Sequence, residues 1–493
     1  MIFSGNTDDP FYAQTINLAV LLGIAVILLV LFFNTKKSPF IPITSFFLFA
    51  LLAFSAFNMF RIDAEYRKVQ EFHQEDKPVV TEINPIFHLS KTGKNTIVIM
   101  LDRAMSSFVP FILEESPDLI EEYSGFIYYP NTVSFGGFTI IAAPALFGGY
   151  EYSPESINKR DSIPMVTKHN EALLVMPRIF SEAGYQVTVT DPPYANYNWN
   201  NDLRIYEPYP EIEALITDSV YTDFWLKEHA LSLPSISDNL KRNMLWYSLF
   251  KISPLAFRRV LYQSGDWCAL FSTDDLITCI NAYAVLDYLP RLTDFTTEKD
   301  NTFLLMVNNT PHENASLQAP EYRPSINVVN SGSGPFKRLS AYHVNIASLK
   351  RLADWFAYLK IQDVYDNTRI ILVSDHGIRN KYADKMPDNF PVITENFNPL
   401  LMVKDFSASG SLKTDMTFMS NADVPFLALN DQIENPKNPF TNEKISIEEK
   451  KNPLYINVSA DTDFNTTQMP LNPNEDYYVH TDIFNPENWE RVK

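Results

Sequence analysis

Residues 342–377 read YHVNIASLKRLADWFAYLKIQDVYDNTRIILVSDHG, and this stretch decides the fold class. Residues 342–360 have the pattern of a helix, whereas residues 368–373 form a continuous apolar run rich in β-branched side chains. An apolar run without alternation is typical of a strand that is buried on both faces. A helix that leads into such a strand predicts an α/β protein with a largely parallel sheet.

Four further apolar runs repeat the pattern of the 368–373 strand. They span residues 96–101, 185–190, 302–307 and 399–403, and helical stretches lie between them. The alternation predicts an α/β sandwich, in which ligands bind at the carboxyl ends of the strands. The first candidates for a site are therefore the residues that follow the runs: Asp102, Asp191, Asn308 to His312, Asp375 and His376.

Asp375 and His376 place a carboxylate and an imidazole side by side at the end of a strand, and Gly377 permits a sharp turn. Both side chains can reach one metal ion, although the same pair can instead cap a helix. Asp102 is a second carboxylate at the end of a buried strand, where an acid without a partner is rare. Its alternative role is an ion pair with Arg103 or with a later basic residue.

Thr139 lies in the stretch SFGGFTIIAAPALFGGY, residues 134–150, which has the pattern of a glycine-rich loop that leads into a helix. A hydroxyl at a helix N-terminus faces free backbone N–H groups, which favour an anionic substrate. Thr139 is therefore a candidate nucleophile, activated by a metal ion. The alternative is that Thr139 is only the N-cap of the helix.

Together, Asp102, Thr139, His312 and the SDHG motif at residues 374–377 resemble the sulfatase-like branch of the alkaline-phosphatase superfamily. This branch includes lipoteichoic acid synthases and phosphoethanolamine transferases. The resemblance covers residues 95–430 and implies an alkaline-phosphatase-like sandwich. It further implies that one divalent metal ion is held by Asp102, Thr139, Asp375 and His376.

The resemblance also implies that His312 binds the substrate or protonates the leaving group; its alternative is a loop histidine bonded to Glu313. Manganese or zinc is weakly favoured as the metal, and magnesium or calcium also suits mixed Asp, Thr and His ligands. A C/S-x-P-x-R motif, which sulfatases need, is absent around Thr139, so sulfate ester hydrolysis is disfavoured. Only one acid stands at position 102, which favours a single-metal site.

Two apolar runs near the N-terminus, residues 16–33 and 43–60, are each long enough to cross most of a bilayer. Pro39 and Pro42 separate them, so they predict a transmembrane hairpin rather than one helix. Lys36 and Lys37 in the connecting loop predict that this loop is cytoplasmic and that everything after residue 60 is extracytoplasmic. The alternative, a cleaved signal peptide, lacks a charged n-region.

These features predict a multi-pass protein of the cell membrane with four parts. The expected boundaries are a transmembrane hairpin over residues 1–60, a juxtamembrane linker over 61–94, the catalytic domain over 95–430 and a C-terminal capping subdomain over 431–493. The aromatic segment at residues 192–210 is either a wall of the pocket or ordinary packing.

The composition of the chain argues against a nucleic-acid-binding protein and against a zinc site made of cysteines. A net charge of −19 argues against nucleic acid as a partner, because a phosphate backbone needs a concentrated basic surface. Two cysteines, Cys268 and Cys279, are too few for a thiolate zinc site; they form either one disulfide or two free thiols.

The predicted function is metal-dependent transfer of a phosphoryl-linked head group, phosphoglycerol or phosphoethanolamine, through a phosphothreonine intermediate. The expected donor is a phospholipid, and the expected acceptor is a glycan or glycolipid of the cell envelope. The alternatives are a phosphodiesterase of the same fold and a non-catalytic, lipid-sensing relative.

Overall fold

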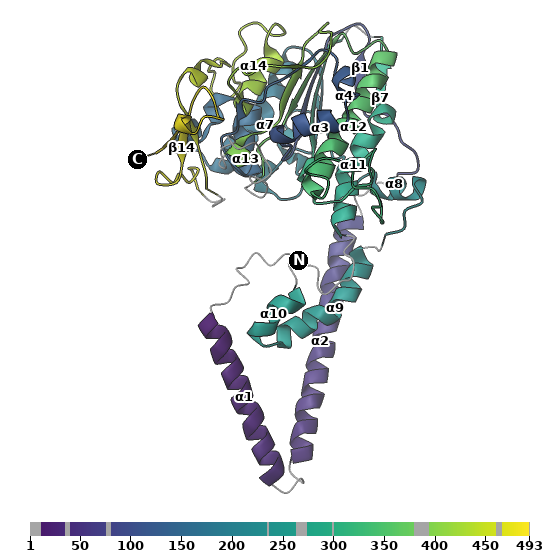
Figure 1. The fold of residues 1–493 in the computed structure, drawn as a ribbon, viewed down its shortest axis with the longest axis vertical. Helices are drawn as coiled ribbons and strands as arrows, with labels where there is room; N and C mark the ends of the chain where they lie inside the picture. The colour runs from purple at the N-terminus through teal and green to yellow at the C-terminus, as the bar shows by residue number, and fades with distance from the viewer. Residues whose placement is uncertain are drawn as a thin grey trace. The chain divides into compact units, whose positions relative to one another are not determined.

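The computed structural model describes residues 11–34, 40–74, 80–233, 236–262, 274–297, 300–378, 394–459 and 466–492. The chain divides into two compact units, which Figure 1 draws as ribbons. The first unit comprises residues 1–79 and 232–274, and the second comprises residues 80–231 and 275–493. Each unit is described by itself.

The first unit is helical. Its elements are α1 (Phe11–Asn34), α2 (Phe40–Gln74), α9 (Ile236–Ile252) and α10 (Leu255–Tyr262). Two stretches, Tyr12–Val30 in α1 and Thr44–Arg61 in α2, are long and apolar enough to cross a membrane. Pro42 lies in the first turn of α2, where its missing N–H has no partner to lose. Lys36 and Lys37, on which the predicted orientation depends, lie outside the described residues.

Residues 61–74 continue helix α2, although the sequence analysis assigns them to a linker. The segment reads RIDAEYRKVQEFHQ and contains no glycine and no proline before Pro78. Polar side chains such as Glu, Arg, Lys and Gln are good helix formers, so a polar composition does not prevent a helix. The α2 helix therefore extends well beyond its apolar part.

The second unit is built on an eight-stranded sheet with the order β11-β3-β10-β9-β2-β8-β5-β6. The strands from β9 to β6 in this order pair in parallel, as predicted. Strand β10 is antiparallel to both β9 and β3. The bounds are β2 Asn95–Leu101, β3 Phe126–Tyr128, β5 Gln186–Thr190, β6 Ile212–Leu215, β8 Thr302–Asn308, β9 Thr368–Val373, β10 Leu401–Lys404 and β11 Lys413–Thr414.

Helices cover both faces of this sheet. Figure 1 shows α7 (Met165–Glu182) and α14 (Val424–Leu429) on one side, and α11 (Asp274–Leu292) and α12 (Ser340–Ile361) on the other. Every residue of β2, β8 and β9 is buried, which explains why their sequences are apolar without alternation. The mixed α/β architecture with a largely parallel sheet is therefore confirmed.

Shorter elements complete the second unit. The helices are α3 (Val109–Glu115), α4 (Leu119–Glu122), α5 (Thr139–Gly148), α6 (Pro154–Asn158), α8 (Thr222–Glu228) and α13 (Thr394–Phe397). Strands β1 (Phe87–Ser90) and β7 (Thr293–Thr296) pair with each other, as do β4 (Thr132–Val133) and β12 (Met419–Ser420).

The C-terminal residues form a three-stranded antiparallel sheet of β13 (Leu454–Ile456), β14 (Tyr477–Val479) and β15 (Trp489–Arg491). Ile456 and Val479 share a core cluster with Phe135 of the glycine-rich loop. Residue Asn457 also forms a β-bridge with Gly136. The C-terminal residues thus support the loop that leads to Thr139.

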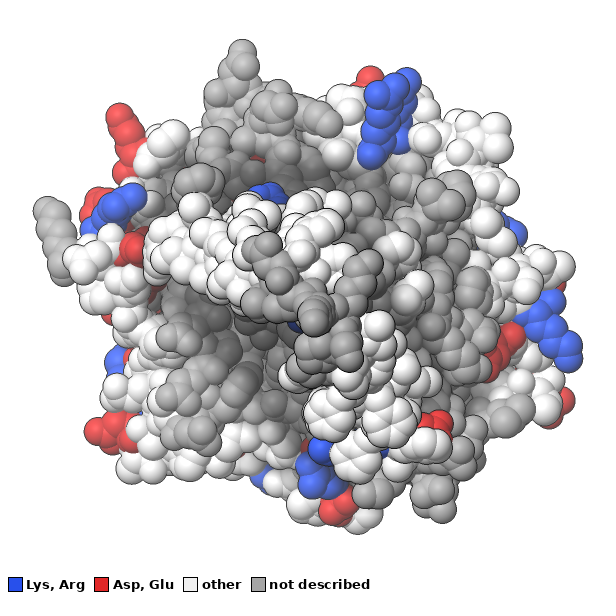
Figure 2. All heavy atoms as spheres, turned by 90° about the horizontal axis from the view of Figure 1, so that it is seen from below, with Lys and Arg blue, Asp and Glu red and all other residues white. Residues whose placement is uncertain are grey.

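Surface charge does not mark a site on the face drawn in Figure 2. Blue Lys and Arg side chains and red Asp and Glu side chains lie there in small, separate groups.

Candidate metal centre

The strand ends place the predicted side chains next to one another. β2 pairs with β9 on one side and with β8 on the other, and its last residues face Val373 and Asn308. Asp102 follows β2, and Asp375 follows β9 by two residues. Because the strands are parallel, their carboxyl ends meet at one edge of the sheet.

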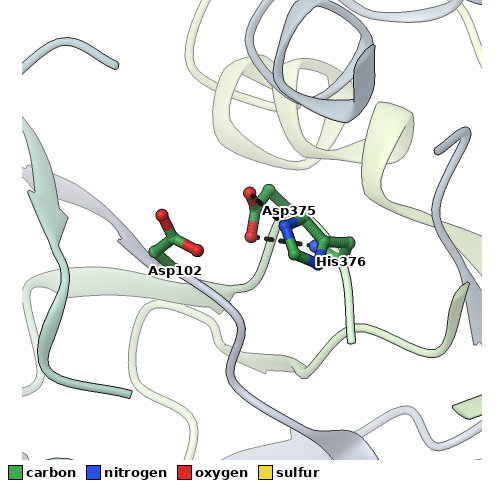
Figure 3. A group of neighbouring side chains, drawn as sticks. All are labelled: Asp102, Asp375 and His376. Atoms are coloured by element: carbon green, nitrogen blue, oxygen red, sulfur yellow. Dashed lines mark hydrogen bonds and ion pairs between the residues drawn. The ribbon is translucent and has the colours of Figure 1, made fainter. Parts of the chain in front are cut away.

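Asp102, Asp375 and His376 form a cluster that could hold a metal ion. One ligand atom from each residue lies within 4.8 Å of the other two, and all three side chains are buried. Figure 3 shows Asp102 facing Asp375 and His376, which come from the neighbouring strand. The structure thus brings together three of the residues predicted from separate parts of the sequence.

The imidazole of His376 is oriented by its own turn. Its Nδ1–H donates to the carbonyl oxygen of Gly377 at 2.6 Å. This bond leaves the lone pair on Nε2, which lies 3.4 Å from Oδ2 of Asp375. A backbone carbonyl on one ring nitrogen is the usual way in which a metal-binding histidine is held.

Each carboxylate keeps one oxygen free of hydrogen bonds. Oδ1 of Asp375 accepts from the backbone N–H groups of Arg103, at 3.0 Å, and His376, at 2.9 Å. Oδ2 of Asp375 and Oδ1 of Asp102 are buried without a hydrogen-bond partner. Burial and the charge of Asp375 raise the pKa of Asp102 to about 7. Two unpartnered carboxylate oxygens and a free imidazole lone pair fit a divalent cation. The charge of the cation would offset the repulsion between the two carboxylates.

The hydroxyl of Thr139 faces the same cluster. Its Oγ1 lies 3.5 Å from Oδ2 of Asp102 and 3.5 Å from Nε2 of His376. Thr139 is the first residue of α5; the N-cap is Phe138, and no side chain caps this helix. The alternative that Thr139 is only an N-cap therefore does not hold. Its hydroxyl points at the metal-binding atoms and not at the helix backbone.

Two glycines allow the backbone to approach this closely. A Cβ on Gly377 would lie 2.0 Å from the carbonyl oxygen of Glu395, and one on Gly137 would lie 1.9 Å from Nδ2 of Asn396. Neither glycine has a positive φ. Gly377 is therefore required for close packing, which differs from the sharp turn expected from the sequence.

His312 lies beyond the end of β8, in the turn Thr310–His312. Burial and the charge of Arg103 lower the pKa of His312, while the charges of Glu313 and Asp375 act in the opposite direction. Its Nδ1 is 4.0 Å from Oε1 of Glu313, too far for the hydrogen bond of the alternative interpretation. The side chain is 38% exposed and so remains accessible to a substrate.

Arg103 also belongs to the site, although the sequence offers it only as a possible ion-pair partner of Asp102. It has a φ of 62°, an uncommon conformation for a side chain of this size, and its N–H holds Asp375. Its Nη1 donates to the carbonyl of His312 at 3.4 Å, and no ion pair joins it to Asp102 among the described residues. The position of Arg103 in the sequence could have identified it, because an arginine directly after Asp102 must lie at the same strand end.

An aromatic side chain from the 192–210 segment also lies near the carboxylates. The pKa of Tyr194 is raised to about 12 by burial and by the charges of Asp102 and Asp375. Its ring meets Trp199 edge to face at 5.7 Å, and Trp199 is 81% exposed. The charges of Asp102 and Asp375 thus act on this part of the segment.

Asp191 and two hydroxyls that precede Thr139 in the chain are engaged elsewhere. Asp191 accepts hydrogen bonds from Thr217 and Asn201, and Thr132 and Ser134 donate to the backbone carbonyls of Tyr129 and Gly136. Cys279 is a buried thiol whose pKa is raised by burial, and Cys268 lies outside the described residues. The disulfide therefore stays a prediction.

No family model and no curated protein matches the chain. Among solved structures, the chain is similar to an alkaline phosphatase superfamily protein from Vibrio parahaemolyticus, with 11% identity, a TM-score of 0.43 and coverage of 83% of this chain and 84% of that one. It is also similar to the lipoteichoic acid synthase LtaP from Listeria monocytogenes, with 12% identity, a TM-score of 0.39 and coverage of 84% and 90%.

A third similar structure is the integral membrane lipooligosaccharide phosphoethanolamine transferase A from Neisseria meningitidis, with 11% identity, a TM-score of 0.35 and coverage of 75% and 61%. The solved structures that match thus include a member of the superfamily that the sequence resembles. With TM-scores below 0.5, the activity has to be argued from the site itself.

Proposed function

We propose that this chain is a membrane-anchored, metal-dependent phosphotransferase. It moves a phosphoryl-linked head group, phosphoglycerol or phosphoethanolamine, from a membrane phospholipid to a glycan or glycolipid of the cell envelope. Asp102, Thr139, Asp375 and His376 hold the metal. When bound, the metal supplies positive charge that polarises the phosphoryl oxygens and favours the alkoxide form of a hydroxyl.

The observation that carries this proposal is the position of the Thr139 hydroxyl. It lies beside Asp102 and His376 at the first residue of a ten-residue helix, and it does not cap that helix. The hydroxyls of Thr132 and Ser134, which precede Thr139 in the chain, donate instead to backbone carbonyls. The helix N-terminus adds a positive potential that favours a phosphate group at this point.

The chemistry then proceeds in two displacements at phosphorus. In the first step, Oγ1 of Thr139 attacks phosphorus, and the bond from phosphorus to the diacylglycerol oxygen breaks. His312 gives a proton to the departing oxygen. The proton of Thr139 passes toward Oδ2 of Asp102, which the hydroxyl faces. In the second step, an acceptor hydroxyl attacks phosphothreonine and gives its proton to His312. The Oγ1–P bond breaks, and Thr139 recovers its proton.

Arg103 supports this scheme as the cationic side chain of the site. Its guanidinium lies beside His312, and a planar guanidinium suits the non-bridging oxygens of a phosphodiester. The two apolar helices would keep the second unit at a bilayer, where phospholipid donors are concentrated. The donor and the acceptor are inferred from this combination.

The test is to incubate the full chain in vesicles with a phospholipid that carries a fluorescent acyl chain, and to follow the release of diacylglycerol. With a glycolipid acceptor, we expect transfer of the head group; without one, we expect a phosphoryl-linked adduct on Thr139 by mass spectrometry. Release of free head group in both conditions would favour the phosphodiesterase instead. No turnover in metal-loaded protein would favour the non-catalytic relative and would contradict the proposal.

A further inference from the structure

Residues 236–262, which form α9 and α10, are grouped with the apolar helices α1 and α2, although they are an insertion in the sequence of the second unit. We call these residues the arm. Helix α10 packs against α1, and the backbone N–H of Leu255 donates to Oδ1 of Asn17 at 3.2 Å. The arm therefore contacts a helix that is a candidate membrane span.

The contact lies near one end of α1. Asn17 is six residues after Phe11, or about 9 Å along a helix with a rise of 1.5 Å per residue. Asn17 lies in the first part of the candidate span Tyr12–Val30, so the arm contacts this span near its N-terminal end.

Large apolar side chains of the arm are exposed. Phe257 is 55% exposed and Val260 is 61% exposed, and residues three apart share a face of a helix. Leu245 in α9 is 62% exposed. Phe257 and Val260 together form an exposed apolar face on α10, and adjacent exposed apolar side chains indicate an apolar partner more than single ones do.

The charge of the arm is opposite to that of the chain. The arm contains five basic residues, Lys241, Arg242, Lys251, Arg258 and Arg259, and one acid, Asp238, whereas the whole chain has a net charge of −19. It also contains Trp246, Tyr247 and Phe250, side chains that favour the interface between water and lipid. Basic and aromatic residues beside exposed apolar ones are typical of helices that lie in the surface of an anionic bilayer.

We propose that the arm inserts the exposed face of α10 into the surface of the membrane that α1 spans, where the exposed Arg259 contacts anionic lipid head groups. This inference rests on the membrane anchoring of the proposed function. It adds a contact with the lipid to those of α1 and α2, formed by residues that are inserted in the sequence of the second unit.

The experiment uses the full chain in vesicles, with nitroxide labels on single cysteines at positions 257 and 260. The background is Cys268→Ser, with the buried Cys279 left in place. Collisions with oxygen report lipid, and collisions with a water-soluble nickel chelate report water. A label at Leu22 of α1 is the lipid control, and a label at Ile361, an apolar residue of the second unit that is 76% exposed, is the water control.

In vesicles that contain phosphatidylglycerol, we expect labels at 257 and 260 to collide more with oxygen than with the nickel chelate, as the Leu22 label does. In pure phosphatidylcholine, both labels should be shallower. Arg259→Glu should make the label at 260 shallower in the anionic vesicles, whereas Lys413→Glu in the second unit should not.

Three results would overturn the inference. If the Leu22 label is in lipid but 257 and 260 behave like 361, the arm is aqueous while the proposed anchoring survives. Labels shielded from both reagents, with dipolar broadening between copies, would assign the arm to a contact between chains. If the Leu22 label is also aqueous, the anchoring itself fails, and the inference fails with it.

Discussion

Asp375 and Asp191 are both buried carboxylates just beyond parallel strands of the same sheet, but their hydrogen bonds differ. Asp191 receives hydrogen bonds from the N–H and hydroxyl of Thr217, the N–H of Asp218 and the amide of Asn201. Asp375 keeps Oδ2 without a partner, beside His376 and Asp102. A carboxylate whose bonds are complete stabilises a loop, whereas an incomplete one is available to a ligand.

Asp375→Ala should have the largest effect. Loss of a metal ligand is expected to reduce metal affinity more than about a hundredfold, since loss of a residue that only supports a ligand costs 10–100-fold. Turnover should fall with it. Metal content by plasma emission spectrometry and release of diacylglycerol measure the two effects.

Asp191→Asn is the matched control for this change. It should leave metal content at the wild-type level and lower the free energy of unfolding by about 1–3 kcal/mol, because buried donors lose a charged acceptor. If both variants lose metal, or neither does, hydrogen-bond completeness does not separate a ligand from a structural acid.

Thr139→Ala tests the same distinction among hydroxyls. Turnover should fall by roughly 10⁴-fold or more, as for other lost nucleophiles, while the fold is retained. Thr139→Ser should keep part of the activity, since its primary hydroxyl can still attack phosphorus. Thr132→Ala, which removes a hydroxyl bonded to the backbone, should affect stability rather than turnover. Wild-type turnover in Thr139→Ala would assign the nucleophile to another group.

Arg103→Gln should have a smaller effect, a loss of about 10–100-fold in kcat/KM, the range expected for a charged hydrogen bond to substrate. The backbone N–H that holds Asp375 stays, so metal content should not change. Arg103→Lys should recover part of the loss. Equal loss of metal in both variants would mean that the side chain supports the ligands and does not bind substrate.

The smallest expected effect is on stability as a function of pH. Because the folded pKa of Asp102, about 7, is above its ordinary value of 3.8, the metal-free folded state binds the proton more tightly than the unfolded state. This stabilising contribution is present at acidic pH and is lost as pH rises through 7. Urea midpoints of chelator-treated protein should show a steeper decline in wild type than in Asp102→Asn. Identical slopes in wild type and Asp102→Asn would contradict a raised pKa of Asp102 in the folded protein.

Much of this site could be predicted from the sequence because each side chain follows a recognisable buried strand or precedes a helix. Asp102, Asp375 and His376 fall at strand ends, and parallel pairing then brings them together. The sequence could not separate Asp191 from Asp375, since the partners of Asp191 lie at residues 201, 217 and 218 and depend on the folded loop. The positive φ of Arg103 is likewise set by its surroundings and by no local pattern.

The helix over residues 61–74 was missed for a different reason. The polar composition of residues 61–74 does not by itself predict a linker, because helix propensity depends on the absence of glycine, proline and side chains that compete for backbone hydrogen bonds. The arm was missed because its mixed polar and apolar residues have meaning only through the contact with α1.

The most direct test of the metal centre is anomalous diffraction from crystals of the protein grown with manganese or zinc. We expect one anomalous peak bounded by Oδ1 of Asp102, Oδ2 of Asp375, Nε2 of His376 and Oγ1 of Thr139, at about 2.0–2.2 Å from the zinc ligands. Asp191 should have no peak beside it. A peak bound by other residues, or protein that takes up no metal while these four side chains are intact, would contradict the account.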